Sequence, residues 1–411
     1  MNKKVMAVAV AGVFAMPAVA LAQKSTVEIY GRANIGIDNY QAKGSAVVGA
    51  DRDGRIRIYD NSSRVGFRGT EDLGGGLRAI FQFETGVNLD NGSGGQASQS
   101  GAANPSTGFW ATRDSFAGID SNFGRLTFGR QSIYWANGVN AQFAANYINT
   151  EIPWTNGTNL GRISGGGVAV ARVSNVVQYT TPTFGGFNGT LSYSPSGEAV
   201  QNVGASIDTD GTIWGLTLRG TFGAFYAQFD YANNSSNSTN TLAAGVPPQS
   251  EVDFYKLGGS WGYMPGARVG VIWVRTERNN GGGVVTAPGS TGGAIAAGDD
   301  VEQDGWTLNW EHTFGNVQVM AQYGQLGNMK GCNGTTTNAA ACSETKASAF
   351  MVGARYFLSK RTWVYASYNQ IDNKTNNFSD YTGGGITSTT GAPTPFGADP
   401  KIWAFGLFHG F

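Results

Sequence analysis

The chain has 411 residues, with 28 basic and 28 acidic side chains and 62 glycines. No basic patch stands out, so we expect no nucleic-acid partner, and no apolar run of about eighteen residues follows residue 22, which excludes a transmembrane helix. The 23 Phe, 16 Tyr and 10 Trp residues and the many glycines favour a membrane β-barrel, whose mean hydropathy stays low because its strands alternate.

The first 22 residues are a predicted secretory signal peptide. Lys3 and Lys4 precede a short apolar run, and Ala20-Leu21-Ala22 is a small-residue cleavage pattern. The mature protein is therefore expected to comprise residues 23–411, as one exported barrel domain that is slightly acidic once the two lysines are removed.

The opening stretch of the mature chain, VEIYGRANIGID, alternates strictly between apolar and polar residues. Val27, Ile29 and Ile35 share one face, whereas Glu28 and Arg32 share the other. A membrane barrel turns the apolar face to lipid and the charged face to a water-filled lumen. The alternative is a soluble all-β domain such as a sandwich or a lectin, in which these charges would need buried partners.

The same pattern recurs to the end of the chain as strand, tight turn, strand and longer polar loop. The tight turns are TEDLGGG, SNFG, PTFGG, TFG, MPGA, TFGN and SKRT, in which Gly, Asn and Pro allow sharp reversals. The longer segments are 41–55, 90–109, 132–168, 197–211, 233–250, 280–301, 327–345 and 374–399. This order predicts an all-β fold, a closed transmembrane antiparallel barrel of about sixteen strands of about 8–14 residues, with short periplasmic turns and long extracellular loops.

Cys332 and Cys342 lie in one Gly/Thr/Asn-rich segment and are expected to form a local disulfide in an oxidising compartment. No metal site is expected, because the two histidines do not supply the missing ligands. The final strand, KIWAFGLFHGF, is rich in aromatic residues and ends on Phe411. This ending resembles the terminal signature by which the barrel assembly machinery recognises outer-membrane barrels.

The stretch SSRVGFRGTEDLGGGLRAIFQFETGVNLD closely resembles the general porins of Gram-negative bacteria, in particular the neisserial and β-proteobacterial type. FGRLTFGRQ, VVQYTTPTFGGFNGTLSYS and FHGF extend the resemblance over essentially the whole mature chain. The resemblance implies a homotrimeric, sixteen-stranded barrel in the outer membrane, among its lipid and lipopolysaccharide. It also implies a third loop folded into the lumen and passive diffusion of ions and small hydrophilic solutes, without a cofactor.

The resemblance further implies a narrow waist, where arginines on the wall face carboxylates and the resulting field sorts solutes by charge. Arg32, in YGRANIG, and Arg64, in SSRVGF, match wall positions of the family. Arg172, in ARVSNVVQYTTP, matches a third. All three also lie on the polar face of their strands by alternation.

Two further arginines match the family but fit the alternation less well. Arg130, in FGRQ, falls on the apolar face, so a bulge at Gly129 is needed to turn it inward. Arg113, in ATRDSF, lies in a stretch without clean alternation. The inward loop is expected over residues 132–168, and Glu151 is its only carboxylate. A single facing acid predicts a waist with excess positive charge and a preference for anions; the alternative for each arginine is a rim residue without a role in selection.

The main alternative function is a substrate-specific channel for a sugar or an anion. Aromatic side chains in or near the predicted inward loop could stack on sugar rings or anchor the loop to the wall: Tyr134, Trp135, Tyr147 and Trp154. An enzyme is not expected, because acyl transfer needs a base beside the nucleophile, whereas His312 and His409 lie beside a turn and in the last strand. An adhesin or phage-receptor role of the outer loops is compatible with conduction.

Overall fold

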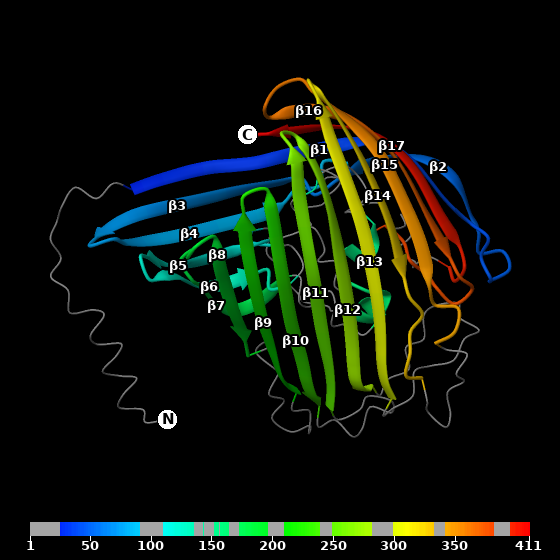
Figure 1. Cartoon of the computed structure of the whole chain (residues 1–411), viewed down its shortest axis with the longest axis horizontal. Helices are drawn as coiled ribbons and strands as arrows, with labels where there is room; N and C mark the ends of the chain where they lie inside the picture. Colours follow the sequence, from blue (N-terminus) through cyan, green and yellow to red (C-terminus); the bar gives the residue numbers. More distant parts are fainter. Residues whose placement is uncertain are drawn as a thin grey trace.

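The computed structural model describes residues 25–90, 110–134, 143, 152–155, 157–163, 172–195, 209–238, 249–281, 299–332, 342–381 and 395–411. Seventeen strand segments in these residues form one antiparallel sheet (Figure 1). They are β1 (Ser25–Lys43), β2 (Arg52–Asp60), β3 (Arg64–Gly74), β4 (Leu77–Gly86), β5 (Ser115–Ser121), β6 (Gly124–Gln131), β7 (Val173–Thr180), β8 (Phe187–Ser194), β9 (Thr209–Phe222), β10 (Phe225–Ser238), β11 (Gln249–Met264), β12 (Ala267–Gly281), β13 (Asp299–Phe314), β14 (Val317–Leu326), β15 (Ala347–Phe357), β16 (Thr362–Asn373) and β17 (Asp399–Gly410). None of the described helices is long and apolar enough to span a membrane.

The sheet closes through β1, which pairs with β17 on one side and with β2 and β3 on the other. The first half of β1 pairs with β3 and its second half pairs with β2. The segments β2 and β3 are therefore two halves of one barrel strand. They are separated at residues 61–63, where Ser62 has a positive φ of 58°. Asn34 of β1 bridges the gap: its carbonyl accepts the Asn61 N–H at 2.8 Å, and its N–H donates to Ser63 Oγ at 2.9 Å. The seventeen segments therefore form the closed sixteen-stranded barrel that the sequence predicts.

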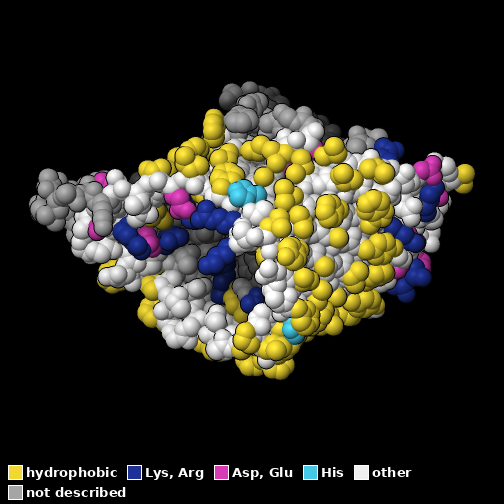
Figure 2. All heavy atoms as spheres, turned by 90° about the horizontal axis from the view of Figure 1, so that it is seen from above, with side chains coloured by type: hydrophobic (Ala, Val, Ile, Leu, Met, Phe, Trp, Pro, Cys, Tyr) yellow, Lys and Arg dark blue, Asp and Glu magenta, His cyan; other side chains and the backbone are white. Residues whose placement is uncertain are grey.

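Side chains alternate between a polar inner face and an apolar outer face. In β13, Trp306, Leu308 and Trp310 are exposed on the outside, whereas Thr307 and Asn309 are buried inside. Hydrophobic side chains cover much of the outer surface in Figure 2, beside an opening into the lumen. The outer face matches hydrocarbon and the inner face matches water, as in a transmembrane barrel.

An aromatic cluster on the outer face lies near the tight turns of β11–β14. Trp310 Nε1 donates to the Tyr263 hydroxyl at 3.0 Å, and His312 stacks on Phe314 with ring centroids 4.1 Å apart. Rings of this kind form the interfacial girdles of membrane barrels. His312 therefore belongs to the outer surface and not to the lumen.

All seven tight turns predicted from the sequence join consecutive strands: β3–β4, β5–β6, β7–β8, β9–β10, β11–β12, β13–β14 and β15–β16. The predicted strand lengths are wrong for several elements, because β1 has 19 residues, β5 has 7, β12 has 15, and β11 and β13 have 16 each. The ends of the long strands are rich in Ser, Asn and Gln, which in the sequence predict loops. They nevertheless continue the backbone ladder, as in the Asn237↔Gln249 pair. Figure 1 shows the long strands β9–β13 as a tall wall beside the short strands β5–β8.

The cysteines lie in the connection between β14 and β15 and form a disulfide, with their Cα atoms 5.8 Å apart. They pack with Val301 and Met329 around Leu160, which belongs to the predicted inward loop. At the other end of the chain, Phe411 and Gly31 exchange two backbone hydrogen bonds of 3.1 Å each. The last residue thus continues the β17–β1 ladder that closes the barrel.

Candidate pore constriction

The described parts of segment 132–168 lie against the inner face of the tall wall. They include a 3-10 turn, η3 (Pro153–Thr155), and a short helix, α2 (Asn159–Ile163). Trp154 Nε1 donates to the Trp306 carbonyl at 3.1 Å, and the N–H of Leu160 donates to Gln303 Oε1 at 2.9 Å. Trp154 fits there because β13 and β14 carry glycines beneath it: a Cβ at Gly324 would lie 2.7 Å from the indole nitrogen.

Two of the aromatic side chains considered for sugar stacking are buried anchors of this segment. Tyr134 and Trp154 are each 1% exposed. The Tyr134 hydroxyl donates to the Tyr255 carbonyl at 2.9 Å, and the Lys256 ammonium lies 4.5 Å from the centre of the Tyr134 ring. Trp135 and Tyr147 lie outside the described residues, as does Glu151.

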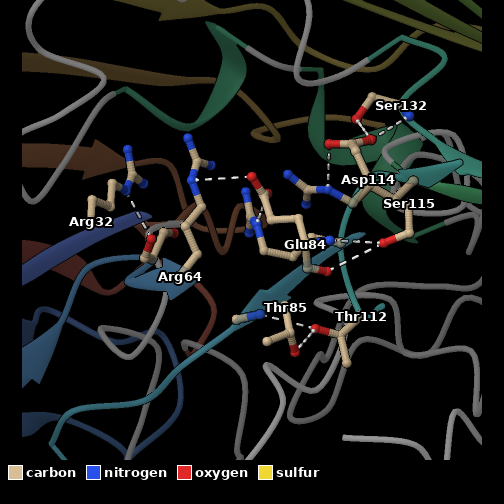
Figure 3. Close-up of polar contacts among 12 residues, drawn as sticks. Arg32, Arg64, Glu84, Thr85, Thr112, Asp114, Ser115 and Ser132 are labelled. Carbon is tan, nitrogen blue, oxygen red and sulfur yellow. Dashed lines mark hydrogen bonds and ion pairs between the residues drawn. The ribbon is translucent and has the colours of Figure 1, made fainter. Parts of the chain in front are cut away.

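On the other side of the lumen, Glu84 of β4 lies at the centre of a polar cluster (Figure 3). Its Oε2 accepts a hydrogen bond from the Tyr30 hydroxyl at 3.2 Å and lies 3.5 Å from Arg64 Nε. Its Oε1 pairs with Arg113 Nε, and the side chains of Glu84 and Arg113 are each only 7% exposed. Glu84 points inward because it follows Gln82 on the polar face of β4, whereas Phe83 points outward.

Asp114, directly before β5, lies next to this cluster and forms a second ion pair. Its Oδ2 accepts a hydrogen bond from Arg172 Nε at 3.2 Å, and its Oδ1 accepts the N–H and Oγ–H of Ser132 at 2.7 Å each. Burial acts to raise the pKa of the Asp114 carboxyl. The charge of Arg172, the hydrogen bonds from Ser132 and the charge of Arg113 outweigh burial, so the pKa lies below its ordinary value of 3.8.

Arg130 reaches the same region through an irregular strand. The β6–β7 register shifts between Gly129 and Gln131, so the bulge that the sequence requires at this point is present. Arg130 Nε donates to the Thr112 carbonyl at 3.2 Å, and one terminal nitrogen donates to Ser174 Oγ at 2.9 Å. Thr112 in turn lies 3.1 Å from the hydroxyl of Thr85 in β4 (Figure 3).

Arg32 and Arg64 extend the cluster toward the closing strand. They are direct partners in the β1–β3 register. Arg32 Nε donates to the Ser62 carbonyl at 2.9 Å, so the gap between β2 and β3 supplies a fixed acceptor for this arginine. Its guanidinium carbon also lies 6.0 Å from the centre of the Phe408 ring.

The five arginines named from the sequence therefore come together, with two carboxylates that sequence reasoning missed. Arg64 and Arg113 contact Glu84, and Arg172 contacts Asp114. Arg32 is the strand partner of Arg64, and Arg130 is bound to Thr112, two residues before Asp114. Glu84 lies on an alternating strand, two residues before Gly86, which is the strand partner of Arg64. Asp114 directly follows Arg113. Alternation and adjacency therefore point to these two carboxylates. The cluster carries an excess of positive charge, and Figure 2 shows Lys and Arg side chains around the opening.

Comparison with known proteins identifies the family of this chain. A family model described as Gram-negative porin matches residues 7–376. An outer membrane porin protein of Bordetella pertussis is 30% identical over 391 residues, covering 89% of this chain and 93% of the relative. A major outer membrane protein P.IB of Neisseria lactamica is 25% identical over 381 residues, covering 89% and 92%.

Solved structures share the fold. An anion-selective porin from Comamonas acidovorans superposes with a TM-score of 0.68 at 22% identity, covering 94% of this chain and all of that one. OmpT of Vibrio cholerae, in its trimer form, superposes with a TM-score of 0.60 at 15% identity. The sequence match, the closed barrel and its water-facing interior agree, and the chain belongs to the Gram-negative porin family, whose members form channels in the outer membrane.

Proposed function

We propose that this porin is a general diffusion channel for ions and small hydrophilic solutes, with a waist that prefers anions. The observation that carries the proposal is the excess of arginines over carboxylates in one contiguous cluster. Low-dielectric walls strengthen the field of such a cluster in the lumen, which attracts anions and repels cations. One structural neighbour is described as anion-selective.

The waist residues that we propose to act on ions are Arg32, Arg64, Arg113, Arg130 and Arg172, with Glu84 and Asp114 lowering their net charge. Glu151 stays a prediction. A substrate-specific sugar channel has less support, because Tyr134 and Trp154 are occupied as buried anchors. We propose no enzymatic role, since His312 packs among outward aromatic rings.

The charge proposal is tested with Arg64→Gln, measured as the reversal potential in a planar bilayer under a salt gradient. We expect wild type to favour anions, and the anion-to-cation permeability ratio to fall roughly two- to fivefold in the variant. One unit charge close to a passing ion changes its energy by about 0.5–1 kcal/mol in water.

The matched control is Arg68→Gln, which removes the same charge from the same strand. Arg68 pairs with Glu28 near the tight turn, and both side chains are more than half exposed, at 54% and 56%. Solvent screens this pair, so the control is expected to behave as wild type. A cation-selective wild type, or equal ratios in both variants, would contradict the proposal.

We also propose that the chain assembles as a homotrimer within outer-membrane lipid and lipopolysaccharide, after cleavage of residues 1–22 and insertion by the barrel assembly machinery. One structural neighbour is described as a trimer. The short strands β5–β8 give the barrel one low side, which would need covering by another surface. Light scattering of the detergent-solubilised protein should give three chains per particle, and a monomeric particle would contradict the trimer.

A further inference from the structure

Three aromatic rings lie together on the inner face of the barrel, on strands β15–β17. Trp363 of β16 stacks on Phe408 of β17 with ring centroids 3.8 Å apart, and meets Phe357 of β15 edge to face at 5.9 Å. The neighbours Tyr356 and Leu407 are exposed on the outer face, so alternation turns Phe357 and Phe408 inward. Trp363 is the direct strand partner of both rings and shares their face. We call Phe357, Trp363 and Phe408 the inner aromatic cluster.

The inner aromatic cluster lies at the tight-turn end of the lumen. Phe357 and Trp363 are the last strand partners before the turn that joins β15 to β16. The interior of a membrane barrel is ordinarily polar, so three rings in contact with one another there need a physical reason. One possible reason is packing alone, and the other is contact with a solute.

Two arginines flank the rings. The guanidinium carbon of Arg355 lies 4.7 Å from the centre of the Phe357 ring and 4.8 Å from that of the Trp363 ring. At the other end of the cluster, Arg32 of the proposed waist lies 6.0 Å from the centre of the Phe408 ring. Cations at such distances are attracted to ring faces. The rings therefore form a continuous line along the wall from Arg355 to Arg32, and in Figure 2 hydrophobic and basic side chains lie beside one another at the opening.

Only part of this line is open to the lumen. Trp363 and Phe408 are 9% and 8% exposed and pack with two methionines. Trp363 Nε1 finds no hydrogen-bond partner among the described residues, so packing and not hydrogen bonding holds this ring. Arg355 and Phe357 are partly exposed. The surface that a solute can reach is therefore one ring beside one guanidinium, supported from behind by two stacked rings.

We propose that Arg355 and Phe357 form a binding site for aromatic carboxylates that pass through the lumen. A guanidinium stacked on a ring still presents its planar fork of N–H donors to a carboxylate, and the ring of the solute packs against Phe357. A small inorganic anion would meet only the charge, and a neutral sugar would gain nothing from it. The inference rests on the proposed function only in that small solutes enter the lumen, and it does not depend on the charge preference of the waist.

The test measures how three compounds block the chloride current of the full-length porin in planar bilayers, with each compound added to both chambers. Benzoate carries the ring and the charge. Cyclohexanecarboxylate has the same charge and a similar size without a π system, and benzamide has the ring without the charge. The measured quantity is the concentration that halves the current. The ratio of this concentration for cyclohexanecarboxylate to that for benzoate isolates the aromatic contact within each variant.

In wild type we expect this ratio to be about three- to tenfold, the range that an aromatic contact provides. Benzamide should not block at concentrations at which benzoate halves the current. Phe357→Leu keeps an apolar side chain and loses the ring, so its ratio should fall to about one. Arg355→Gln should raise the half-blocking concentrations of both carboxylates several-fold, because it removes the charge that they share.

The matched control is Tyr356→Leu, which removes a ring from the neighbouring position of the same strand. Tyr356 is 46% exposed on the outer face, where no solute in the lumen can reach it. Its ratio should equal that of wild type. A ratio that falls in both Phe357→Leu and Tyr356→Leu would assign the effect to a general change in the strand and would contradict the site.

The proposal is overturned if benzoate and cyclohexanecarboxylate block wild type equally, or if Phe357→Leu keeps the wild-type ratio. Benzamide that blocks as well as benzoate would also overturn it, because the charge would then have no part in binding. If Arg355→Gln does not form a folded barrel, Phe357→Leu and the benzamide comparison decide alone. A wild type without anion preference that shows the ratio and loses it in Phe357→Leu would end the charge proposal and leave this site intact.

Discussion

The five arginines of the proposed waist differ in how directly they can meet a passing ion. The Arg113 side chain is 7% exposed and is paired with an equally buried Glu84. Arg64 and Arg172 keep 29% and 23% of their side-chain surface exposed. A buried ion pair contributes a fixed and largely cancelled field, whereas a partly exposed guanidinium can exchange water for a solute anion. Substitution of Arg64 or Arg172 should therefore change ion preference more than substitution of Arg113.

Protonation of Asp114 should change the charge of the waist only at a pH below the one at which an ordinary aspartate is protonated. Its pKa is lowered in the folded protein, so the Asp114–Arg172 pair contributes stability and charge above the unfolded pKa, and both are lost as pH falls through the folded value. Arg172, Arg113 and Arg130 face Asp114 and stay protonated throughout this range. Glu84 is the nearest other carboxylate of the cluster.

The measurement is the reversal potential against pH for wild type and Asp114→Asn, in which this position cannot titrate. At pH 7 the variant should prefer anions more strongly than wild type. The difference between the two should shrink as pH falls, with a midpoint below the ordinary value of 3.8. A difference that vanishes already near pH 5 would show that the ion pair with Arg172 does not hold Asp114 in its ionised form.

At the scale of a single strand, β6 shows how a local irregularity aims a side chain. Gly129 has a φ of 147°, and a Cβ there would lie 2.3 Å from the Ser115 carbonyl oxygen. We expect Gly129→Ala to cost about 1–3 kcal/mol from the backbone conformation alone and to displace Arg130. The variant should therefore unfold at lower temperature and lose part of its anion preference.

Gly189→Ala in the nearby strand β8 is the control for this substitution. The added Cβ would come no closer than 3.4 Å to the flexible end of Leu218. Both unfolding temperature and reversal potential should match wild type. If Gly129→Ala keeps the full anion preference of wild type, the bulge is not needed to direct the Arg130 side chain into the lumen.

Strand pairing and turns were largely predictable, because both depend on residues close together in sequence. Gly or Pro marks every tight turn except SKRT, and alternation identifies the outer face of nearly every strand. The gap between β2 and β3 was not predictable, since Asn34, which completes its hydrogen bonds, lies about thirty positions away on β1. Alternation and adjacency to Arg113 point to Glu84 and Asp114, whereas the pairing of Asp114 with Arg172 forms only in the folded barrel, so the sequence does not predict it.

At the scale of the whole molecule, closure joins β1, the first described strand, to β17 and Phe411. Phe411 and Gly31 exchange two backbone hydrogen bonds, and a Cβ on Gly31 would lie 2.5 Å from the Phe411 ring. Gly31 therefore leaves room for the terminal aromatic side chain. An open edge at this seam would leave backbone groups unpaired in lipid, which costs several kcal/mol for each group.

Two variants separate the backbone contribution of Phe411 from that of its ring. Phe411→Ala keeps both hydrogen bonds and loses the ring, whereas deletion of residue 411 loses both. If the seam needs the backbone pairing, deletion should lower the yield of folded, heat-modifiable barrel well below that of Phe411→Ala. Leu407→Ala, on the same outward face of β17 and similarly exposed, should assemble as wild type. Equal defects in both Phe411 variants would assign the effect to the ring, and so to recognition during assembly and not to closure of the sheet.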